Sequence, residues 1–366
     1  MIASIPFLQD TKRNMQSMAD LPIAGFNQNL QADLPAAGLL SAVYVYVVGT
    51  IRTGTGTSGN WDPNYWPWNL LQKIYLRTNA GFNVFDNMSG YSTFLVNSLS
   101  HRGNQFGASP PISGGFNNTS NVGPRTGISI YPTGALADST DYPFGIWYKI
   151  PVTMDEALGV GLILLANQYV KVTLECQVNS AAAFGNLGTG ATISASIKPT
   201  PLVWSVPKPE NYPFESLNRV HIWQEVQKDW TASGEQFFDV LPSGTFTRII
   251  ADVENNGAPQ AFFSGASDPT TPNFGDTKTI WASNQSPEVI DFRTRLLMMR
   301  EFYGMDLPQG CIEFNYATLQ SAELGWNPTT SWNTDQATQF GVRMQINATP
   351  TAGKIRYIQE RIESRR

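Results

Sequence analysis

The segment Lys149–Asn179 carries the pattern that most restricts the fold of this chain. Residues 170–178 alternate one for one between apolar and polar side chains, the period-two pattern of a β-strand with one face on a core. The apolar members are Val170, Val172, Leu174, Cys176 and Val178. The preceding run Leu158–Ala166 is almost entirely apolar, but its nine residues are too few for a membrane helix, which needs roughly 20. We interpret the run as a strand buried on both faces, so the whole segment predicts β-sheet.

The composition of the full chain also favours an all-β protein. Charged residues make up 14% of the 366 residues, against about 25% in a typical globular domain. Glycine occurs 31 times and proline 24 times, as expected for many short strands joined by glycine- and proline-rich loops. At about 150 residues per domain, the length indicates two domains.

A proline-rich stretch divides the chain. Five prolines fall between residues 199 and 213. Because proline fixes φ and cannot donate to a sheet ladder, we interpret this stretch as an extended connector. The expected organisation is an N-terminal arm (1–20), a first domain (21–198), a linker (199–214), a second domain (215–360) and a basic C-terminal tail (361–366).

The two halves repeat one another in outline. A Leu-Pro turn with a glycine shortly after it begins at Leu34 and again at Leu241, and a strand pattern that ends at a glycine follows each turn. An alternating strand lies near the end of each half, from Val170 and from Gly341. The common order of these elements favours two similar domains.

Two local patterns predict a hairpin and a helix. In NLLQKIYLRTNAGFNVFD, two strand patterns flank Asn79–Gly81, which predicts a turn. The stretch SPEVIDFRTRLLMMREFYG predicts a helix with Ser286 as N-cap, Pro287 at the first helical position and Gly304 at the end. Its apolar face would consist of Val289, Phe292, Leu296, Met299 and Tyr303.

The sequence offers little for nucleic-acid binding, metal binding or secretion. A net charge of −5 provides no general basic field, so we expect no direct nucleic-acid binding. Cys176 and Cys311 each lie in an apolar strand pattern, which favours buried free thiols. The two histidines, His101 and His221, are too scattered to supply a zinc site, and we expect no metal and no cofactor. The N-terminus lacks a basic start followed by a long apolar stretch, which predicts no secretory signal.

Catalytic motifs are equally sparse. No phosphate-binding loop and no nucleophile elbow occurs. A glycosidase would need two carboxylates on opposite sides of the scissile bond. The nearest pairs are Asp155 with Glu156 and Glu225 with Asp229, but sequence proximity is their whole support, and Glu156 equally fits a capping box with Thr153.

Aromatic residues mark candidate assembly contacts. Three tryptophans lie between residues 61 and 68, where indoles could pack inside the protein, anchor an interface or stack on sugar rings. In the strand pattern 42–48 one face carries valines and the other carries tyrosines, so we expect another domain or subunit to cover the tyrosines. The candidate contacts are Tyr44, Tyr46, Trp61, Trp66 and Trp68.

Basic residues near the two termini form a second candidate surface. They are Lys12, Arg13, Arg365 and Arg366. Such residues could rest on anionic lipid headgroups, or they could belong to solvated chain ends.

These patterns resemble the double jelly-roll major capsid proteins of tailless, icosahedral, membrane-containing phages, the tectivirus-like lineage. The resemblance lies in LPSGTFTRIIADVENNG, LPQGCIEFNY and FGVRMQINATPTAGKIRYIQERIE of the second half, and in NLLQKIYLRTNAGFNVFDNMSGY of the first. It covers residues 34–363 and implies two tandem eight-stranded jelly rolls with a few short helices in loops. It also implies that three chains form a pseudo-hexagonal capsomer.

The leading hypothesis is therefore a non-enzymatic major capsid protein that self-assembles as homotrimers into an icosahedral virion shell. The resemblance implies as partners other copies of the chain, penton and minor capsid proteins, and internal membrane lipids. It implies synthesis in the host cytoplasm and residence in the virion. The alternatives are a carbohydrate- or receptor-binding β-sandwich and, less favoured, a sandwich-fold glycoside hydrolase.

Overall fold

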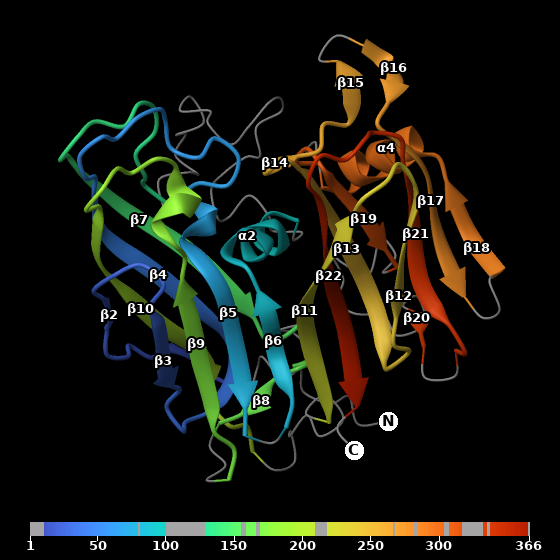
Figure 1. Ribbon diagram of the computed structural model, residues 1–366. Helices are drawn as coiled ribbons and strands as arrows, with labels where there is room; N and C mark the ends of the chain where they lie inside the picture. The colour runs from blue at the N-terminus through green and yellow to red at the C-terminus, as the bar shows by residue number, and fades with distance from the viewer. Residues whose placement is uncertain are drawn as a thin grey trace. The chain divides into compact units, whose positions relative to one another are not determined.

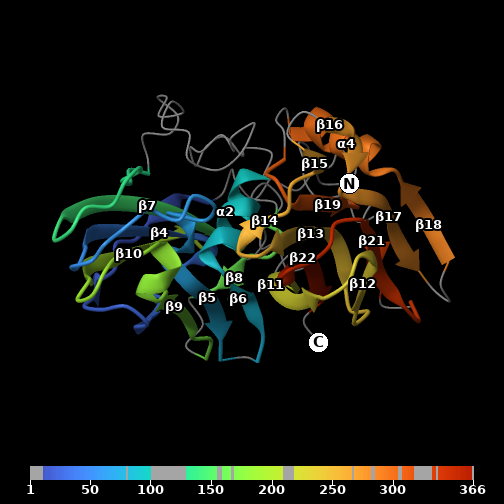
Figure 2. The same cartoon turned by 45° about the horizontal axis from the view of Figure 1, so that its top comes forward.

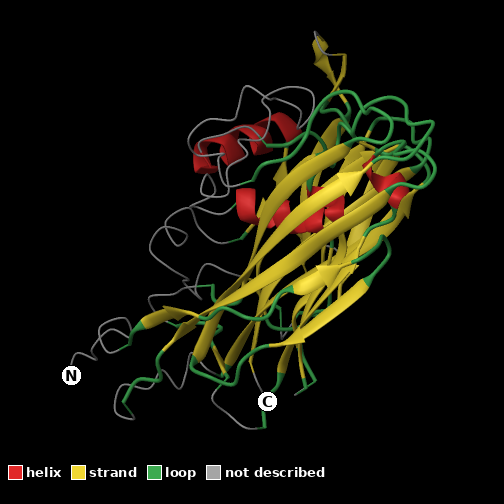
Figure 3. Ribbon diagram, turned by 90° about the vertical axis from the view of Figure 1, so that its left-hand side faces the viewer, coloured by secondary structure: helices red, strands yellow, loops and turns green. Residues whose placement is uncertain are grey.

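The computed structural model describes residues 11–79, 81–99, 129–154, 159–165, 169–208, 218–265, 268–281, 285–303, 307–316, 332–334 and 337–364. Strands dominate the fold and helices are few (Figure 3). The chain divides into two compact units. The first comprises Met1–Ser109, Phe116–Gln224 and Ser364–Arg366, and the second comprises Pro110–Gly115 and Glu225–Glu363.

The first unit is built on two sheets, with strand orders β2-β10-β4-β7 and β3-β9-β5-β6 (Figure 1). Strand β1 pairs with β10 next to β2, and β8 pairs with β4. The strands are β1 Arg13–Met15, β2 Leu21–Ile23, β3 Asn29–Asp33, β4 Leu39–Arg52, β5 Leu71–Thr78, β6 Asn83–Met88, β7 Asp141–Pro151, β8 Ile163–Leu164, β9 Val172–Val178 and β10 Thr192–Trp204. The helical segments are η1 Trp68–Leu70, α2 Gly90–Ser98 and η4 Ala181–Phe184.

The second unit has sheets with strand orders β11-β22-β13-β19 and β12-β21-β17-β18, and the division of the chain falls within β11, between Gln224 and Glu225. These strands are β11 Arg219–Trp230, β12 Gly234–Val240, β13 Thr245–Asn255, β17 Phe274–Trp281, β18 Gln285–Ile290, β19 Cys311–Asn315, β21 Phe340–Ile346 and β22 Gly353–Ser364. A small ribbon of two strands lies beside helix α4 (Figure 2). The remaining elements are β14 Ala258–Pro259, β15 Phe263–Gly265, β16 Asp268–Pro272, β20 Trp332–Asn333 and α4 Phe292–Tyr303.

The two units share one topology. When the eight main strands of each unit are numbered in chain order, one sheet has the order 1-8-3-6 and the other 2-7-4-5. In both units a helix follows the fifth strand, α2 after β6 and α4 after β18. This is the jelly-roll arrangement, and the prediction of two tandem rolls is confirmed.

The alternating strand is confirmed as β9, whose side chains are alternately buried and half-buried. The apolar run before it is different, because regular strand is limited to the two residues of β8 among the described positions 159–165. Gly161 has a φ of +89° in this run. A Cβ there would lie 2.8 Å from the Val152 carbonyl oxygen. This backbone conformation, which glycine tolerates and other residues rarely adopt, replaces the expected long strand by a tight turn.

The proline-rich connector begins later than the composition indicated. Residues 199–204 belong to β10 and pair with β4. The carbonyl oxygen of Pro201 accepts a hydrogen bond from the Gln16 amide, so Pro201 directs its backbone polar groups away from β4. Pro199, two residues earlier, has the same orientation, so neither missing N–H interrupts the β4 ladder. Residues 209–217 of the expected linker lie outside the described residues.

The predicted helix forms, but it begins later than expected. Ser286 and Pro287 belong to strand β18, and the helix starts at Phe292. Asp291 caps it, because its Oδ2 accepts hydrogen bonds from the backbone amides of Arg293 and Thr294. Pairing with β17 keeps residues 285–290 extended, so the helix begins after them and Ser286 is not its N-cap.

In the described part of the chain, the outer edge of β7 is closed by hydrogen bonds to single residues and not by a further strand. Gly145 exchanges backbone hydrogen bonds of 2.7 Å with Ile130. The Trp147 amide donates to Ser129 Oγ at 3.2 Å. Asn97 of α2 completes the edge, since its side-chain amide donates to the Lys149 carbonyl at 2.9 Å and accepts from the Lys149 amide at 2.8 Å. Such closure prevents pairing with a further chain.

Replacing Asn97 by alanine should therefore destabilise the first unit. The substitution removes three hydrogen bonds at a buried position, two to the Lys149 backbone and one to the Thr93 carbonyl, and leaves backbone groups unpaired, which costs roughly 1–3 kcal/mol. Asn79 is a matched control, because its side-chain amide likewise donates to a backbone carbonyl, that of Tyr169, and accepts from the Lys171 amide, but at an exposed position. Urea unfolding of both alanine variants should show a clearly larger loss of unfolding free energy for Asn97→Ala. Equal losses would contradict the edge-closing role.

Candidate assembly surfaces

The tryptophan cluster lies inside the first unit. Trp61, Trp66 and Trp68 are each at most 1% exposed. Trp61 stacks on Trp66 with ring centroids 4.4 Å apart, and Trp68 stacks on Phe94 of α2 at 4.3 Å. Trp66 also donates from Nε1 to the Pro132 carbonyl oxygen at 2.9 Å. The assignment of these indoles to an assembly contact is therefore corrected: they pack the core, and no sugar ring can stack on them.

The tyrosines of β4 have a different environment. Tyr44 and Tyr46 are half-buried, while the valines that alternate with them, Val43, Val45 and Val47, are fully buried. Tyr46 stacks on its cross-strand partner Trp147 of β7 at 4.3 Å. Gly145 makes room for this ring, since a Cβ on Gly145 would lie 2.3 Å from the Tyr46 hydroxyl. The outer aromatic face is thus partly covered within its own sheet, and Tyr44 and Tyr46 stay candidates for a contact with another chain.

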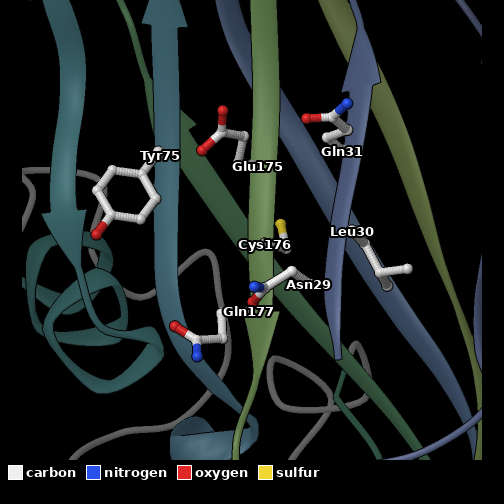
Figure 4. Close-up of a pocket in the computed structure, with 7 residues that line it drawn as sticks. All are labelled: Asn29, Leu30, Gln31, Tyr75, Glu175, Cys176 and Gln177. Atoms are coloured by element: carbon white, nitrogen blue, oxygen red, sulfur yellow. The ribbon is translucent and has the colours of Figure 1, made fainter. Parts of the chain in front are cut away.

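The other sheet of the first unit carries a polar groove of about 300 Å³ (Figure 4). Across three strands, Gln31 of β3 faces Glu175 of β9, which faces Tyr75 of β5. Glu175 is held by Arg77 at 3.0 Å, and the Arg77 guanidinium lies 4.1 Å from the centre of the Tyr75 ring. The lining residues are Asn29, Leu30, Gln31, Tyr75, Glu175, Cys176 and Gln177. Glu175 is the one carboxylate among them, so the groove lacks the acid pair that a glycosidase requires.

The carboxylate pairs considered from the sequence are not brought together where the structure describes them. Glu225 and Asp229 lie on strand β11, where residues four apart are separated by roughly 13 Å. Glu225 is buried and Asp229 is exposed. Asp155 and Glu156 lie outside the described residues.

The second unit contains a buried ionic cluster that the sequence reading missed. Five carboxylates and two guanidiniums share one face of neighbouring strands: Arg248, Asp252 and Glu254 of β13, Arg356 and Glu360 of β22, Glu313 of β19 and Glu225 of β11. The available signal was the spacing of charges at every second or fourth residue in RIIADVEN and IRYIQE, within otherwise apolar strands.

Two arginines organise this cluster. Arg356 binds Asp252 at 2.5 Å and also binds Glu254, while Arg248 binds Glu360 at 2.5 Å and Glu313 at 3.5 Å. Oδ1 of Asp252 accepts no hydrogen bond from any residue that the structure describes. Burial raises the pKa of Asp252 to about 6, and the Glu254 and Glu225 carboxylates add to the rise while Arg356 opposes it.

The described residues provide no group of three or more histidine, cysteine or acidic side chains placed to hold a metal ion. His221 is buried, with Nδ1 3.2 Å from the Val152 carbonyl oxygen, and His101 lies outside the described residues. Cys176 and Cys311 are both buried free thiols, as predicted. Burial raises the pKa of the Cys176 thiol to about 12 and raises the pKa of Cys311 well above its usual value.

The basic candidates near the termini are separated by the structure into different settings. Arg13 is the first residue of β1 and is exposed, and Lys12 directly precedes it. Arg356 and Arg361 of the C-terminal stretch are engaged in ion pairs. Arg365 and Arg366 lie outside the described residues. No helix among the described residues has the length and apolar character needed to cross a membrane.

The core position of the tryptophans can be tested at Trp66. Replacement by alanine removes a buried indole and leaves a cavity between its neighbours, so the free energy of unfolding should fall by about 3–5 kcal/mol. The matched control is Tyr169→Ala, because Tyr169 is a large aromatic residue that is 76% exposed. Denaturant unfolding followed by far-UV circular dichroism measures both changes. A small loss of unfolding free energy in Trp66→Ala would contradict its core position and make Trp66 a candidate surface contact again.

The pKa of Asp252 predicts a pH-dependent stability. A carboxyl with a pKa of about 6 in the folded state and 3.8 in the unfolded state binds more protons when folded. Its contribution therefore declines as the pH rises from about 4 to 6, by roughly 3 kcal/mol at 1.36 kcal/mol per pH unit. Relative to wild type, Asp252→Asn should become progressively more stable over this range.

Glu235 is the matched control for this measurement, because its hydrogen bond to Lys278 lowers its pKa. Its contribution is present above the ordinary glutamate pKa and is lost as the pH falls. Glu235→Gln should therefore be most destabilising at neutral pH and should approach wild type in acid. Unfolding curves at several pH values compare both variants. If the free energies of unfolding of Asp252→Asn and wild type changed in parallel with pH, the raised pKa of Asp252 would be contradicted.

Comparisons with known proteins identify the fold. No model of a protein family matches the sequence, and no curated protein matches it. Among solved structures, the major capsid protein of Sulfolobus Turreted Icosahedral Virus has a TM-score of 0.67 at 10% identity, over 96% of this chain and 97% of that chain. The PBCV-1 virus capsid gives 0.62 at 12% identity, over 96% and 94%.

The major capsid protein of Bacteriophage PM2 gives a TM-score of 0.53 at 10% identity, over 96% of this chain and 98% of that chain. Identities this low establish a common fold and nothing further. This chain has the double jelly-roll fold of viral major capsid proteins.

Proposed function

We propose that this chain is a viral major capsid protein that assembles as a homotrimer and then as an icosahedral shell. The observation that carries the proposal is the full-length match: both rolls are present in one chain, and 96% of it aligns with 97% of a capsid protein that has the same fold. Function does not follow from fold in general, because many folds host unrelated functions. The capsid proteins match here over nearly the whole length of both chains.

The surface chemistry supports assembly over catalysis. Charged residues are scarce in the sequence at 14%, and the outer face of β4 and β7 carries the half-buried rings of Tyr44, Tyr46 and Trp147. Obligate interfaces are depleted in charge at their centre and enriched in aromatic residues. The proposed partners are other copies of the chain, with penton and minor capsid proteins at the vertices and internal membrane lipids near the basic residues Lys12 and Arg13. The proposed location is the virion, after synthesis in the host cytoplasm, with no direct contact to nucleic acid.

The soluble unit should be a trimer of three 40.3 kDa chains, about 121 kDa. In a closed three-fold ring every complementary surface is already bound, so no further chain is added. Interfaces of the obligate class bury more than about 2,000 Å², so the trimer should survive a hundredfold dilution. Sedimentation equilibrium with a chelator present measures this, and negative-stain images should show particles with a hexagonal outline. A stable monomer of 40.3 kDa at every concentration would reject the proposal.

A further inference from the structure

The polar groove of the first unit lies on the outward face of the sheet β3-β9-β5-β6 (Figure 4). The even-numbered residues of β9 are buried, so Glu175 and Gln177 point outward. Strand pairing places Gln177 beside Asn29 of β3 and Glu175 beside Gln31. The volume of about 300 Å³ is that of roughly ten water molecules, which is about the size of one hexose ring with its hydroxyl groups.

Three side-chain amides line this groove and have no hydrogen-bond partner in the described part of the chain. They belong to Asn29, Gln31 and Gln177. Other amides of the first unit are engaged, since those of Asn79 and Asn97 both donate to and accept from the backbone. An amide side chain carries both donors and acceptors. The groove therefore presents an unused set of both kinds to a ligand.

The acidic groups on this face are already paired. Glu175 binds Arg77 at 3.0 Å, and Asp33 of β3 binds Lys171 at 2.8 Å. A charged ligand would have to compete with these ion pairs for its opposite charge, whereas a neutral ligand leaves them in place. The face thus favours a neutral, polar ligand.

Tyr75 borders the groove with an aromatic ring that is fixed by its neighbours. The Arg77 guanidinium lies over this ring, 4.1 Å from its centre, and the Tyr75 hydroxyl donates to Oδ1 of Asn87 at 3.1 Å. The same guanidinium holds Glu175. Side chains that are ordered before binding lose little conformational entropy when a ligand arrives, so even a small ligand can be held.

Two other classes of ligand do not suit this face. A peptide strand needs a free sheet edge, but β9 pairs with β3 and β5, and β5 pairs with β9 and β6. An apolar molecule needs a mainly hydrophobic lining. The lining here is mostly amides and a carboxylate, with Leu30, Tyr75 and the buried Cys176 as its less polar members. A neutral ligand rich in hydroxyl groups is the class that fits.

We propose that this groove binds a hexose unit of a neutral polysaccharide. Each sugar hydroxyl both donates and accepts, which matches the amides of Asn29, Gln31 and Gln177, and two adjacent hydroxyls can donate to the Glu175 carboxylate. The C–H groups of the sugar would rest against the exposed part of the Tyr75 ring. The inference goes beyond the proposed function and does not depend on it, because it concerns a carbohydrate ligand and not the contacts between copies.

Saturation-transfer NMR on the full-length protein tests the site. The probes are the methyl glycosides of glucose, galactose, mannose and N-acetylglucosamine, in which the methyl group stands where the polysaccharide chain would continue. At least one glycoside should receive saturation from the protein. The double variant Gln31→Ala/Gln177→Ala should weaken its binding at least tenfold. The matched control is Gln227→Ala, because Gln227 is an exposed glutamine on β11 away from the groove, and this variant should bind as wild type does.

Inorganic phosphate is the charged competitor, because Lys73 of β5 lies beside Gln177 in the strand register. Phosphate at the concentration of the glycoside should not displace it. Three results would each overturn the saccharide site: no saturation transfer to any glycoside, undiminished binding by the double variant, or displacement by phosphate. Sedimentation of the same double variant separates this inference from the capsid proposal. The trimer should persist whether or not the glycoside binds, and a monomeric wild-type chain that binds the glycoside would reject the capsid proposal alone.

Discussion

Unpaired backbone groups at the edges of sheets are the constraint on which both rolls depend. A jelly roll is an open sandwich, so every sheet ends in strands whose N–H and C=O groups would otherwise recruit other chains without selection. Two edges are closed by side chains or short segments. Gly145, Trp147 and Lys149 of β7 are satisfied by neighbouring loops and by Asn97, and the Phe237 carbonyl of β12 accepts from Lys228 at 2.8 Å.

The two units reach the same topology with different interiors. The first is filled by aromatic stacking around Trp61, Trp66 and Trp68, which needs few polar partners. The second places Arg248 and Arg356 among buried carboxylates on strands β13 and β22. Ion pairs of this kind seldom add stability over apolar packing, because desolvation offsets the attraction, but removing one partner is costly. The same topology thus accommodates an aromatic interior in one unit and ionic packing in the other.

Much of the architecture could be predicted because it depends on local pattern. The alternation at Val172–Val178 and the turn after Thr78 required no knowledge of distant residues, and both rolls follow from such patterns taken in order. The errors arose where tertiary pairing decided the outcome. Pro199 and Pro201 lie within a strand because their missing N–H groups face away from β4, and Ser286–Ile290 forms β18 because β17 lies beside it. Sequence alone does not state the direction in which a backbone amide points.

The candidate site was harder to predict for the same reason. An aromatic cluster in the sequence predicts burial equally well in a core or in an interface, and Trp61, Trp66 and Trp68 proved to be core residues. The ionic cluster joins four strands that are distant in sequence, so no local window contained it. The role of Tyr44 and Tyr46 in assembly stays a prediction, drawn from the local pattern of a single strand with two apolar faces.

The burial of both thiols affects whether disulfides can form between copies of the chain in an assembled shell. Thiolate is the form that attacks disulfides and oxidants, and the raised pKa values of Cys176 and Cys311 leave almost none of it at neutral pH. Many copies of this chain could therefore stand in close contact without covalent scrambling. A particle built from them would keep the same bonds when it moves from a reducing cell interior to an oxidising exterior. Its cohesion would be reversible, so errors in assembly could be corrected by dissociation.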